Sequence, residues 1–168
     1  MKKVFYLVAI VLFCACEEIS PVPETFTFNI NGTEMDFSEN IVVSKSWLSG
    51  EIKITGKKTG VGKITMTLNE PLTGVYNENN YVFNDDDFTY NYRLSYTDNN
   101  DNLYTYYTSS INEWFIINIK KFENRIDGEV SGEFSGFLVG SILNESNALD
   151  SVVIENGKFS TQISDKIE

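Results

Sequence analysis

Apolar and polar residues alternate along most of the chain that follows residue 24. In the segments EIKIT (51–55) and KITMTL (63–68), every second residue is apolar. This period is typical of β-strands with one buried face. It places on the inner faces Ile52, Ile54, Ile64, Met66 and Leu68. The connection GKKTGVG (56–62) is rich in glycine and lysine and predicts a turn.

A β-hairpin is predicted near the start of this region. The alternating segments TFTFNI and TEMDF flank Asn31-Gly32. An Asn-Gly pair favours a type I′ turn because both turn positions need positive φ. The apolar side chains expected to meet across the hairpin are Phe26, Phe28, Ile30, Met35 and Phe37. A second such pair, Asn156-Gly157, lies in the last alternating segment.

Short alternating segments continue toward the end of the chain. Residues 112–140 predict a strand, a turn near NRIDG (124–128) and a longer strand from Glu129 to Leu138. No window carries a sustained helical period, apart from a weak turn near 143–149. The pattern therefore predicts an all-β fold, a single antiparallel β-sandwich or barrel-like domain of roughly nine or ten strands. The length of 168 residues favours one domain.

The first residues have the pattern of a signal peptide. Lys2 and Lys3 precede an apolar run over 4–13. This run is too short to cross a bilayer as a helix, which needs ~20 residues, but it matches a secretory apolar region of ~7–15 residues.

The two cysteines of the chain, Cys14 and Cys16, follow this run directly. A metal site would need further ligands, and the sequence has no other Cys and no His. A disulfide between residues two apart would be strained. A lipoprotein signal fits better: residues 1–15 are removed and Cys16 is acylated. Ordinary secretion after cleavage nearby is the alternative.

The predicted mature chain has three parts. Residues 16–24 are the acylated Cys16 and a flexible tether, 25–161 form the all-β domain, and 162–168 are a frayed tail. Glu17 and Glu18 resemble the surface-export signal of Bacteroidota lipoproteins, so the protein is expected at the outer membrane, on the cell surface or on the periplasmic face.

Charge and composition limit the function. The formal net charge is -11, from 13 basic and 24 acidic residues. Without Lys2 and Lys3 the balance is 11 basic against 24 acidic residues, or -13. This charge opposes binding to nucleic acid and to anionic lipid. The absence of histidine removes the commonest general base and metal ligand. We therefore expect no enzymatic activity and no cofactor.

Two acidic loops are candidates for a calcium site. Asn84–Asp87 is one, and Asp98, Asn100 and Asn102 begin the other like an EF-hand loop. Leu103 then stands where that loop needs glycine, and Ser109 where it needs glutamate. Asn and Asp also form ordinary turns, which is the alternative.

Aromatic residues are candidates for ligand contact. Tyr104, Tyr106 and Tyr107 could form an exposed row that stacks on sugars or grips a protein. The alternation of Tyr90, Tyr92, Leu94 and Tyr96 indicates a core face instead. Trp47 and Trp114 are expected to be buried.

Two further groups of residues are candidate sites. Asp127, Glu129 and Glu133 share a predicted solvated face, and two such carboxyls at a set separation would be needed for glycoside cleavage. Ser151, in the sequence DSV, resembles the O-glycosylation motif of exported Bacteroidota proteins.

A series of short sequences resembles a known family. These are the leader, FTFNINGTEMDF, GEIKITG, ITMTLNEPLTGVY, VSGEFSG and VVIENGKFS. From Phe26 to Phe159 the chain resembles a family of small uncharacterised Bacteroidota lipoproteins, a domain of unknown function. The resemblance implies an all-β protein at the outer membrane and supplies no catalytic residue. Met35 departs from it, since tryptophan is expected there.

These patterns together predict a lipid-anchored β-domain that binds a ligand, or a protein or glycan partner. Two alternatives remain open at this point. One is a lipocalin-like carrier of a small apolar ligand, which needs a cavity inside the barrel. The other is a glycan hydrolase that uses only carboxylates, which needs converging acids with raised pKa values in a cleft.

Overall fold

The computed structural model describes residues 22–46, 48–69, 73–77, 92–105, 114–143 and 149–164. In these ranges the chain forms strands and no helix. The strands are β1 (Thr25–Ile30), β2 (Thr33–Asp36), β3 (Ile41–Lys45), β4 (Glu51–Lys58), β5 (Gly62–Asn69), β6 (Gly74–Asn77), β7 (Tyr92–Asp98), β8 (Leu103–Thr105), β9 (Trp114–Phe122), β10 (Glu129–Leu143) and β11 (Leu149–Gln162).

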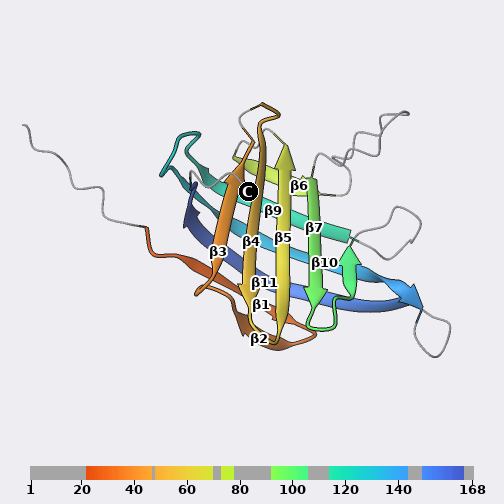
Figure 1. Ribbon diagram of the computed structural model, residues 1–168. Helices are drawn as coiled ribbons and strands as arrows, with labels where there is room; N and C mark the ends of the chain where they lie inside the picture. The colour runs from red at the N-terminus through yellow and green to blue at the C-terminus, as the bar shows by residue number, and fades with distance from the viewer. Residues whose placement is uncertain are drawn as a thin grey trace, which may run out of the picture.

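All strand pairs are antiparallel and belong to one sheet. The order is β2-β1-β11-β10-β8-β7-β5-β4-β3, and β9 pairs with both β10 and β6. The sheet curls into a half-barrel (Figure 1). The all-β prediction is confirmed, and the described ranges hold 11 strands where roughly nine or ten were expected.

Strand β10 joins two halves of the sheet. Along one edge it pairs first with β9, from Val130 to Phe137, and then with β8 at Val139 and Gly140. The back half therefore holds β1, β2, β6, β9, β10 and β11, and the front half holds β3, β4, β5, β7 and β8. Figure 1 shows the front strands crossing the back strands steeply. At 15 residues, β10 extends five residues beyond the predicted end at Leu138.

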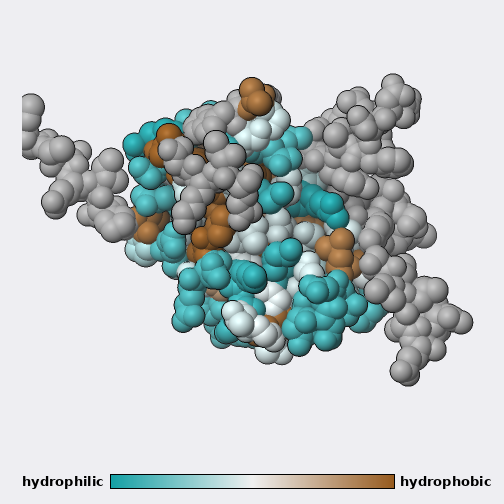
Figure 2. Space-filling model, viewed as in Figure 1, coloured by the Kyte–Doolittle hydropathy of each residue, from teal (hydrophilic) through white to brown (hydrophobic). Residues whose placement is uncertain are grey.

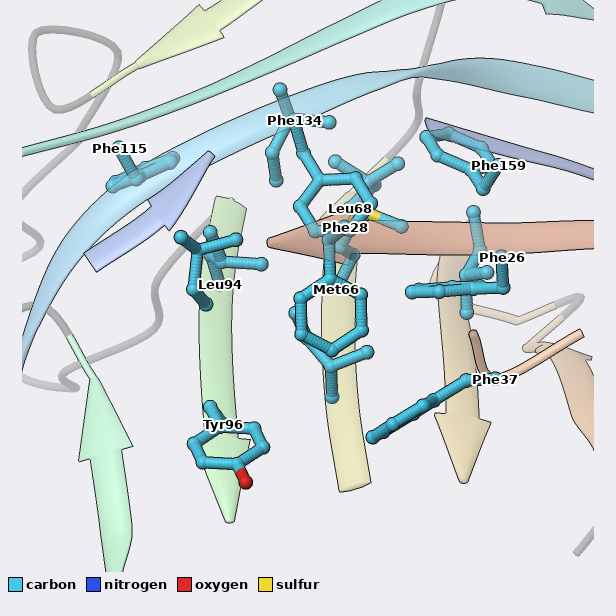
Figure 3. Close-up of a cluster of buried hydrophobic side chains, with 14 of the residues drawn as sticks. Phe26, Phe28, Phe37, Met66, Leu68, Leu94, Tyr96, Phe115, Phe134 and Phe159 are labelled. Atoms are coloured by element: carbon cyan, nitrogen blue, oxygen red, sulfur yellow. The ribbon is translucent and has the colours of Figure 1, made fainter. Parts of the chain in front are cut away.

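The core lies between the two halves. The predicted inner residues of β4 and β5 are all fully buried, as the alternation requires. Opposite them, phenylalanine rings from the back half pack with ring centroids 5.0–6.4 Å apart: Phe26, Phe28, Phe37, Phe134 and Phe159. Figure 3 shows these rings meeting Met66, Leu68 and Leu94 from the front half. Side chains thus occupy the inward face.

Gly56 lets the front half approach β1. A Cβ atom at this position would lie 2.9 Å from Cγ of Phe26, closer than side chains normally pack. The predicted turn over 56–62 is accordingly shorter than expected. Gly56, Lys57 and Lys58 continue β4, Gly62 begins β5, and only 59–61 form the turn.

The two Asn-Gly pairs adopt different structures. Asn31 and Gly32 have φ values of 49° and 80°, which confirms the predicted hairpin between β1 and β2. Asn156 also has positive φ, 53°, but it lies inside β11, which continues on both sides of it. Phe134 pairs with Gly157 and Gly136 with Ile154, so β11 carries one extra residue here. The second pair forms a β-bulge, which bends the strand.

The C-terminal segment is more ordered than predicted. Ile163 is fully buried, its backbone N–H donates to the carbonyl of Gly128 at 2.9 Å, and its carbonyl accepts from Asp127 at 2.9 Å. Ser164 Oγ donates to the Val43 carbonyl of β3 at 2.7 Å. The predicted frayed tail from Gln162 is therefore wrong up to Ser164. These bonds bring the chain after β11 against the far edge of the front half.

Adjacent substitutions at the bulge should have different effects. A Cβ atom at position 157 would lie 2.5 Å from the carbonyl oxygen of Phe134. We expect Gly157→Ala to lower the free energy of unfolding by about 1–3 kcal/mol. The neighbouring Asn156→Gly keeps the positive φ without strain, so its effect should be under about 1 kcal/mol. Urea unfolding at pH 7 measures both, and equal losses would contradict this description of the bulge.

Candidate functional site

The outward face of the front half carries a polar groove. It has a volume of ≈ 760 Å³ and is lined by outward residues of β3, β4, β5 and β7, with Asn40, Leu103 and the ends of these strands completing it. This volume lies in the range of ~300–1,000 Å³ that is usual for ligand sites. In Figure 2, pale and weakly polar side chains run through the middle of this face, with strongly hydrophilic ones around them.

Short side chains form the floor of the groove. Strand register places Val42, Thr55, Thr65 and Ser95 in one row across β3, β4, β5 and β7. The hydroxyls of Thr55 and Thr65 lie 3.3 Å apart, and Ser95 Oγ donates to the Thr65 carbonyl at 3.5 Å. Small hydroxyl residues in this row leave space above the sheet, which is why the face is hollow there.

Long cationic side chains border this floor on two sides. On one side of the floor, at a distance of two positions along each strand, a row is formed by Lys53, Thr67 and Arg93. Two residues in the other direction, Lys57 lies directly opposite Lys63. With a rise of ~3.4 Å per residue, these cationic borders are about 14 Å apart.

The borders give the groove a positive charge on an acidic protein. Lys53, Lys57 and Lys63 are exposed, and no carboxylate among the described residues forms an ion pair with them. Glu51 is the one acid among the described residues that line the groove. Like charges directly opposite each other destabilise a sheet, and the Lys57–Lys63 pair is such a case. An anion placed between them would relieve this repulsion.

Arg93 is held in place at the border. Its Nε donates to Thr105 Oγ1 at 3.2 Å, and that hydroxyl in turn donates to the Leu94 carbonyl at 3.2 Å. Thr105 is only 3% exposed, so this contact holds the guanidinium end of Arg93 against the sheet. The guanidinium keeps its positive charge at this border of the groove.

The proposed calcium loop at Asp98 is an internally bonded turn. Asp98 Oδ1 accepts from the backbone N–H groups of Asn100 at 2.8 Å and Asn102 at 2.9 Å, and Oδ2 accepts from Asn102 Nδ2 at 2.9 Å. Burial alone would raise the pKa of Asp98, but the hydrogen bonds from Asn102 and Asn100 outweigh it and lower the pKa. These bonds engage both carboxylate oxygens of Asp98, one of the three residues expected to bind calcium, and calcium binding here stays a prediction. The other candidate, Asn84–Asp87, lies outside the described residues.

The tyrosines of β7 and β8 face inward. Tyr96 and Tyr104 are each 6% exposed, so Tyr104 is a core residue and the alternative of an exposed aromatic row does not hold for it. Tyr104 Oη donates to Asp150 Oδ2 at 3.1 Å. Burial, followed by this contact with the Asp150 carboxylate, raises the pKa of Tyr104 to about 12. Leu94 is buried and Tyr92 packs against the core, as the alternation predicted. Tyr90, Tyr106 and Tyr107 lie outside the described residues.

The carboxylates of β10 bind neighbouring lysines. Glu129 lies 2.6 Å from Lys121 Nζ, and Glu133 lies 3.2 Å from Lys120 Nζ. The hydrogen bonds from Lys121 and then Arg125 lower the pKa of Glu123 beside them. A general acid for glycoside cleavage needs a raised pKa instead. Glu133 is exposed and Glu129 half-buried on the outward face, as predicted, whereas Asp127 lies in the turn before β10 and is not on this strand.

Two outward positions on the back half bear on other predictions. Trp114 is 36% exposed, so its predicted burial is wrong, because it begins β9 on the outward face beside exposed Ile116. Trp47 is outside the described residues.

Ser151 is half-buried in β11, and its backbone N–H donates to Asp150 Oδ1 at 2.9 Å. Asp150 therefore has a structural role, and O-glycosylation of Ser151 stays a prediction.

The predicted leader and anchor lie outside the described residues, including Cys14, Cys16, Glu17 and Glu18. Where the structure is described, no group of three or more acids, cysteines or histidines is placed to hold a metal ion. The same ranges contain no helix with the length and apolar character needed to span a membrane.

Sequence reasoning missed the groove. The apolar positions of β4, β5 and β7 were used to predict the core, but the polar positions between them were not interpreted. These polar positions are largely Lys, Thr, Ser and Arg, and this enrichment in cationic and hydroxyl residues could have indicated a groove. The pairing that brings Lys57 opposite Lys63, and Thr55 opposite Thr65, depends on register between strands and could not be obtained from one strand at a time.

Fold and groove define the protein as a single all-β domain, a half-barrel with a filled core and a cationic groove on its outer face. Residues 25–162 match the family described as Domain of unknown function (DUF5025), and the chain belongs to that family. Neither the curated proteins nor the solved structures include a significant match.

The Asp98 turn generates a prediction on pH dependence. Because the pKa of Asp98 lies below its ordinary 3.8 in the folded chain, its carboxylate adds stability above that pH, and this stability is lost as pH falls through the folded value. Asp98→Asn should therefore lower the free energy of unfolding by about 1–2 kcal/mol at pH 7, and the difference from wild type should shrink below about pH 4.

Asp101→Asn is the matched control for that measurement. Asp101 lies in the same turn with φ of 63°, which asparagine tolerates, so its effect should stay within about 0.5 kcal/mol. Urea unfolding with and without added Ca²⁺ measures both variants. If Ca²⁺ raises the stability of the wild type and Asp98→Asn abolishes this rise, the purely structural role of Asp98 would be contradicted and the calcium site established.

Proposed function

We propose that this protein is a lipid-anchored binding domain at the outer membrane, which holds an anionic ligand in the cationic groove and performs no chemistry on it. The observation that carries the proposal is the groove itself. A protein with a net charge of -11 has a hollow bordered by Lys53, Lys57, Lys63 and Arg93, with a single acid among its described lining residues.

The energetics favour a ligand with several negative charges. An exposed ion pair contributes only ~0.2–1 kcal/mol, because water screens it and a long side chain loses freedom. One carboxylate or sulfate would therefore bind weakly. A ligand that contacts both borders at once adds several such contacts and loses its freedom of movement only once.

The anchor rests on the first residues of the chain. The leader with Cys16 after it has the pattern of a lipoprotein signal, and several acyl chains, at ~0.8 kcal/mol per buried CH₂, would hold the protein firmly. The tether over 16–24 can reach about 30 Å when extended. The groove would then be held close to the membrane, on the cell surface if Glu17 and Glu18 act as an export signal, or otherwise on the periplasmic face.

The two alternative functions have less support. A carrier of an apolar ligand needs space inside the barrel, but the inward face is occupied by packed rings such as Phe28 and Phe134. A carboxylate hydrolase needs two acids that converge in a cleft. Glu129 and Glu133 instead pair with lysines on an exposed strand face.

The anchor is tested by the modification of the mature N-terminus. Mass spectrometry of the protein from membranes should show a chain that starts at acylated Cys16. Cys16→Ser should release the protein into the soluble fraction, because the acyl chains are its only proposed hold on the membrane. Cys14→Ser is the control and should leave the protein membrane-bound. An unmodified Cys16 in the mature protein would refute the anchor.

The groove is tested by retention on a sulfonate resin. The full chain in non-ionic detergent at pH 7 and low salt should be retained, although its net charge alone predicts repulsion. Lys57→Gln with Lys63→Gln should abolish retention. Lys120→Gln with Lys158→Gln removes the same charge from the back half and should leave retention unchanged. Equal effects of the two double variants, or no retention of wild type, would refute the proposed function.

A further inference from the structure

We propose that the ligand of the groove is a linear acidic glycan, a chain of sugars with carboxylate or sulfate groups that lies across the strands between the two cationic borders. This inference rests on the proposed function, since it names the ligand class of the same groove. Three features of the groove lead to it: the hydroxyl floor, the engaged backbone and the placement of the cations.

The floor matches the hydrogen bonding of sugars. Hydroxyls line the groove from Thr55, Thr65 and Ser95 in the floor and from Thr67 and Thr97 in the border rows, and a hydroxyl can both donate and accept hydrogen bonds. Sugar hydroxyls have the same dual capacity, so the two surfaces can pair in many registers. A floor of this kind offers a glycan chain contacts along its whole length.

The same floor suits an acidic peptide poorly. Extended peptides usually bind by adding a strand to a sheet edge, where backbone groups are available. The groove instead lies on a sheet face, where the backbone of β4 pairs with both β3 and β5 and that of β5 with both β4 and β7. Peptide side chains also need apolar pockets, and the described apolar lining is limited to Val42 and Leu103, in different rows.

Nucleic acid fits the groove less well than a glycan. Single strands bind on aromatic side chains that stack with the bases. Among the described residues that line the groove there is no aromatic side chain. The net charge of -11 also repels a dense phosphate backbone over the rest of the surface. A sugar chain with more widely spaced charges meets less repulsion.

The cations are spaced for a chain that runs across the strands. Lys53 on β4 and Arg93 on β7 lie two strands apart in one border, about 10 Å, while Lys57 and Lys63 form a close pair in the other. A ligand lying over the hydroxyl floor would have positive charge on both sides. Anionic groups that project from both edges of a glycan chain meet this arrangement.

Calorimetry on the full chain in non-ionic detergent tests the ligand class. The probes are polygalacturonate, dextran sulfate, poly-glutamate and neutral dextran, with the first three matched in charge concentration. We expect polygalacturonate or dextran sulfate to bind about tenfold more tightly than poly-glutamate, since the peptide lacks partners for the hydroxyl floor. The stronger of the two glycans identifies the anionic group. Dextran should not bind.

A double variant separates the floor from the charge. Thr55→Val with Thr65→Val keeps shape and charge but removes two hydroxyls, so glycan affinity should fall about tenfold while retention on the sulfonate resin stays unchanged. Equal affinity for poly-glutamate and the glycans, or no effect of this variant on glycan affinity, would overturn the glycan proposal. The proposed function would still hold in that case if the wild type is retained on the resin. Loss of wild-type binding to both resin and glycans would overturn both.

Discussion

The register of β4, β5 and β7 is the constraint on which the rest of the structure depends. Ile54, Met66 and Leu94 lie side by side in adjacent strands and are fully buried against the back half. A slip by one residue would turn every one of these side chains to solvent, and each buried side chain of this size contributes ~1.5–3 kcal/mol. Burial of these side chains therefore fixes the register between the strands. The same register determines which outward residues lie side by side, so the pairing that fills the core also forms the groove.

The groove also carries a cost that the fold has to offset. Lys57 and Lys63 face each other across adjacent strands, an arrangement that weakens a sheet in the absence of an anion. Apart from Glu51, the described acids lie outside the lining of the groove, and several of them pair with Lys120, Lys121 and Arg125 on and beside β9 and β10. Among the described residues, the groove is therefore a positively charged area on a protein of negative net charge. This separation would direct an anionic chain to the groove and away from the rest of the surface.

Local pattern was enough to predict the strands, and non-local pairing decided the rest. Alternation placed Ile52, Ile64 and Leu68 correctly inside, and Asn31-Gly32 correctly in a hairpin, because both signals act within a few residues. The same pair at Asn156-Gly157 became a bulge because β1 and β10 hold β11 on both sides. Gly56 continued a strand because Phe26, distant in sequence, occupies the space above it. The groove, likewise, exists only once four strands are in register.

The central claim is that the groove on the front half is the binding face, and amide NMR tests it most directly. A ¹⁵N-labelled chain is titrated with oligomers of polygalacturonate, and the shifted amides are assigned to strands. The predicted result is saturable shifts concentrated on the outward positions of β4, β5 and β7, at and around Thr55, Thr65 and Ser95. Shifts concentrated on the back half, around Trp114 and Ile116 of β9, or small shifts spread evenly over the whole chain, would contradict it.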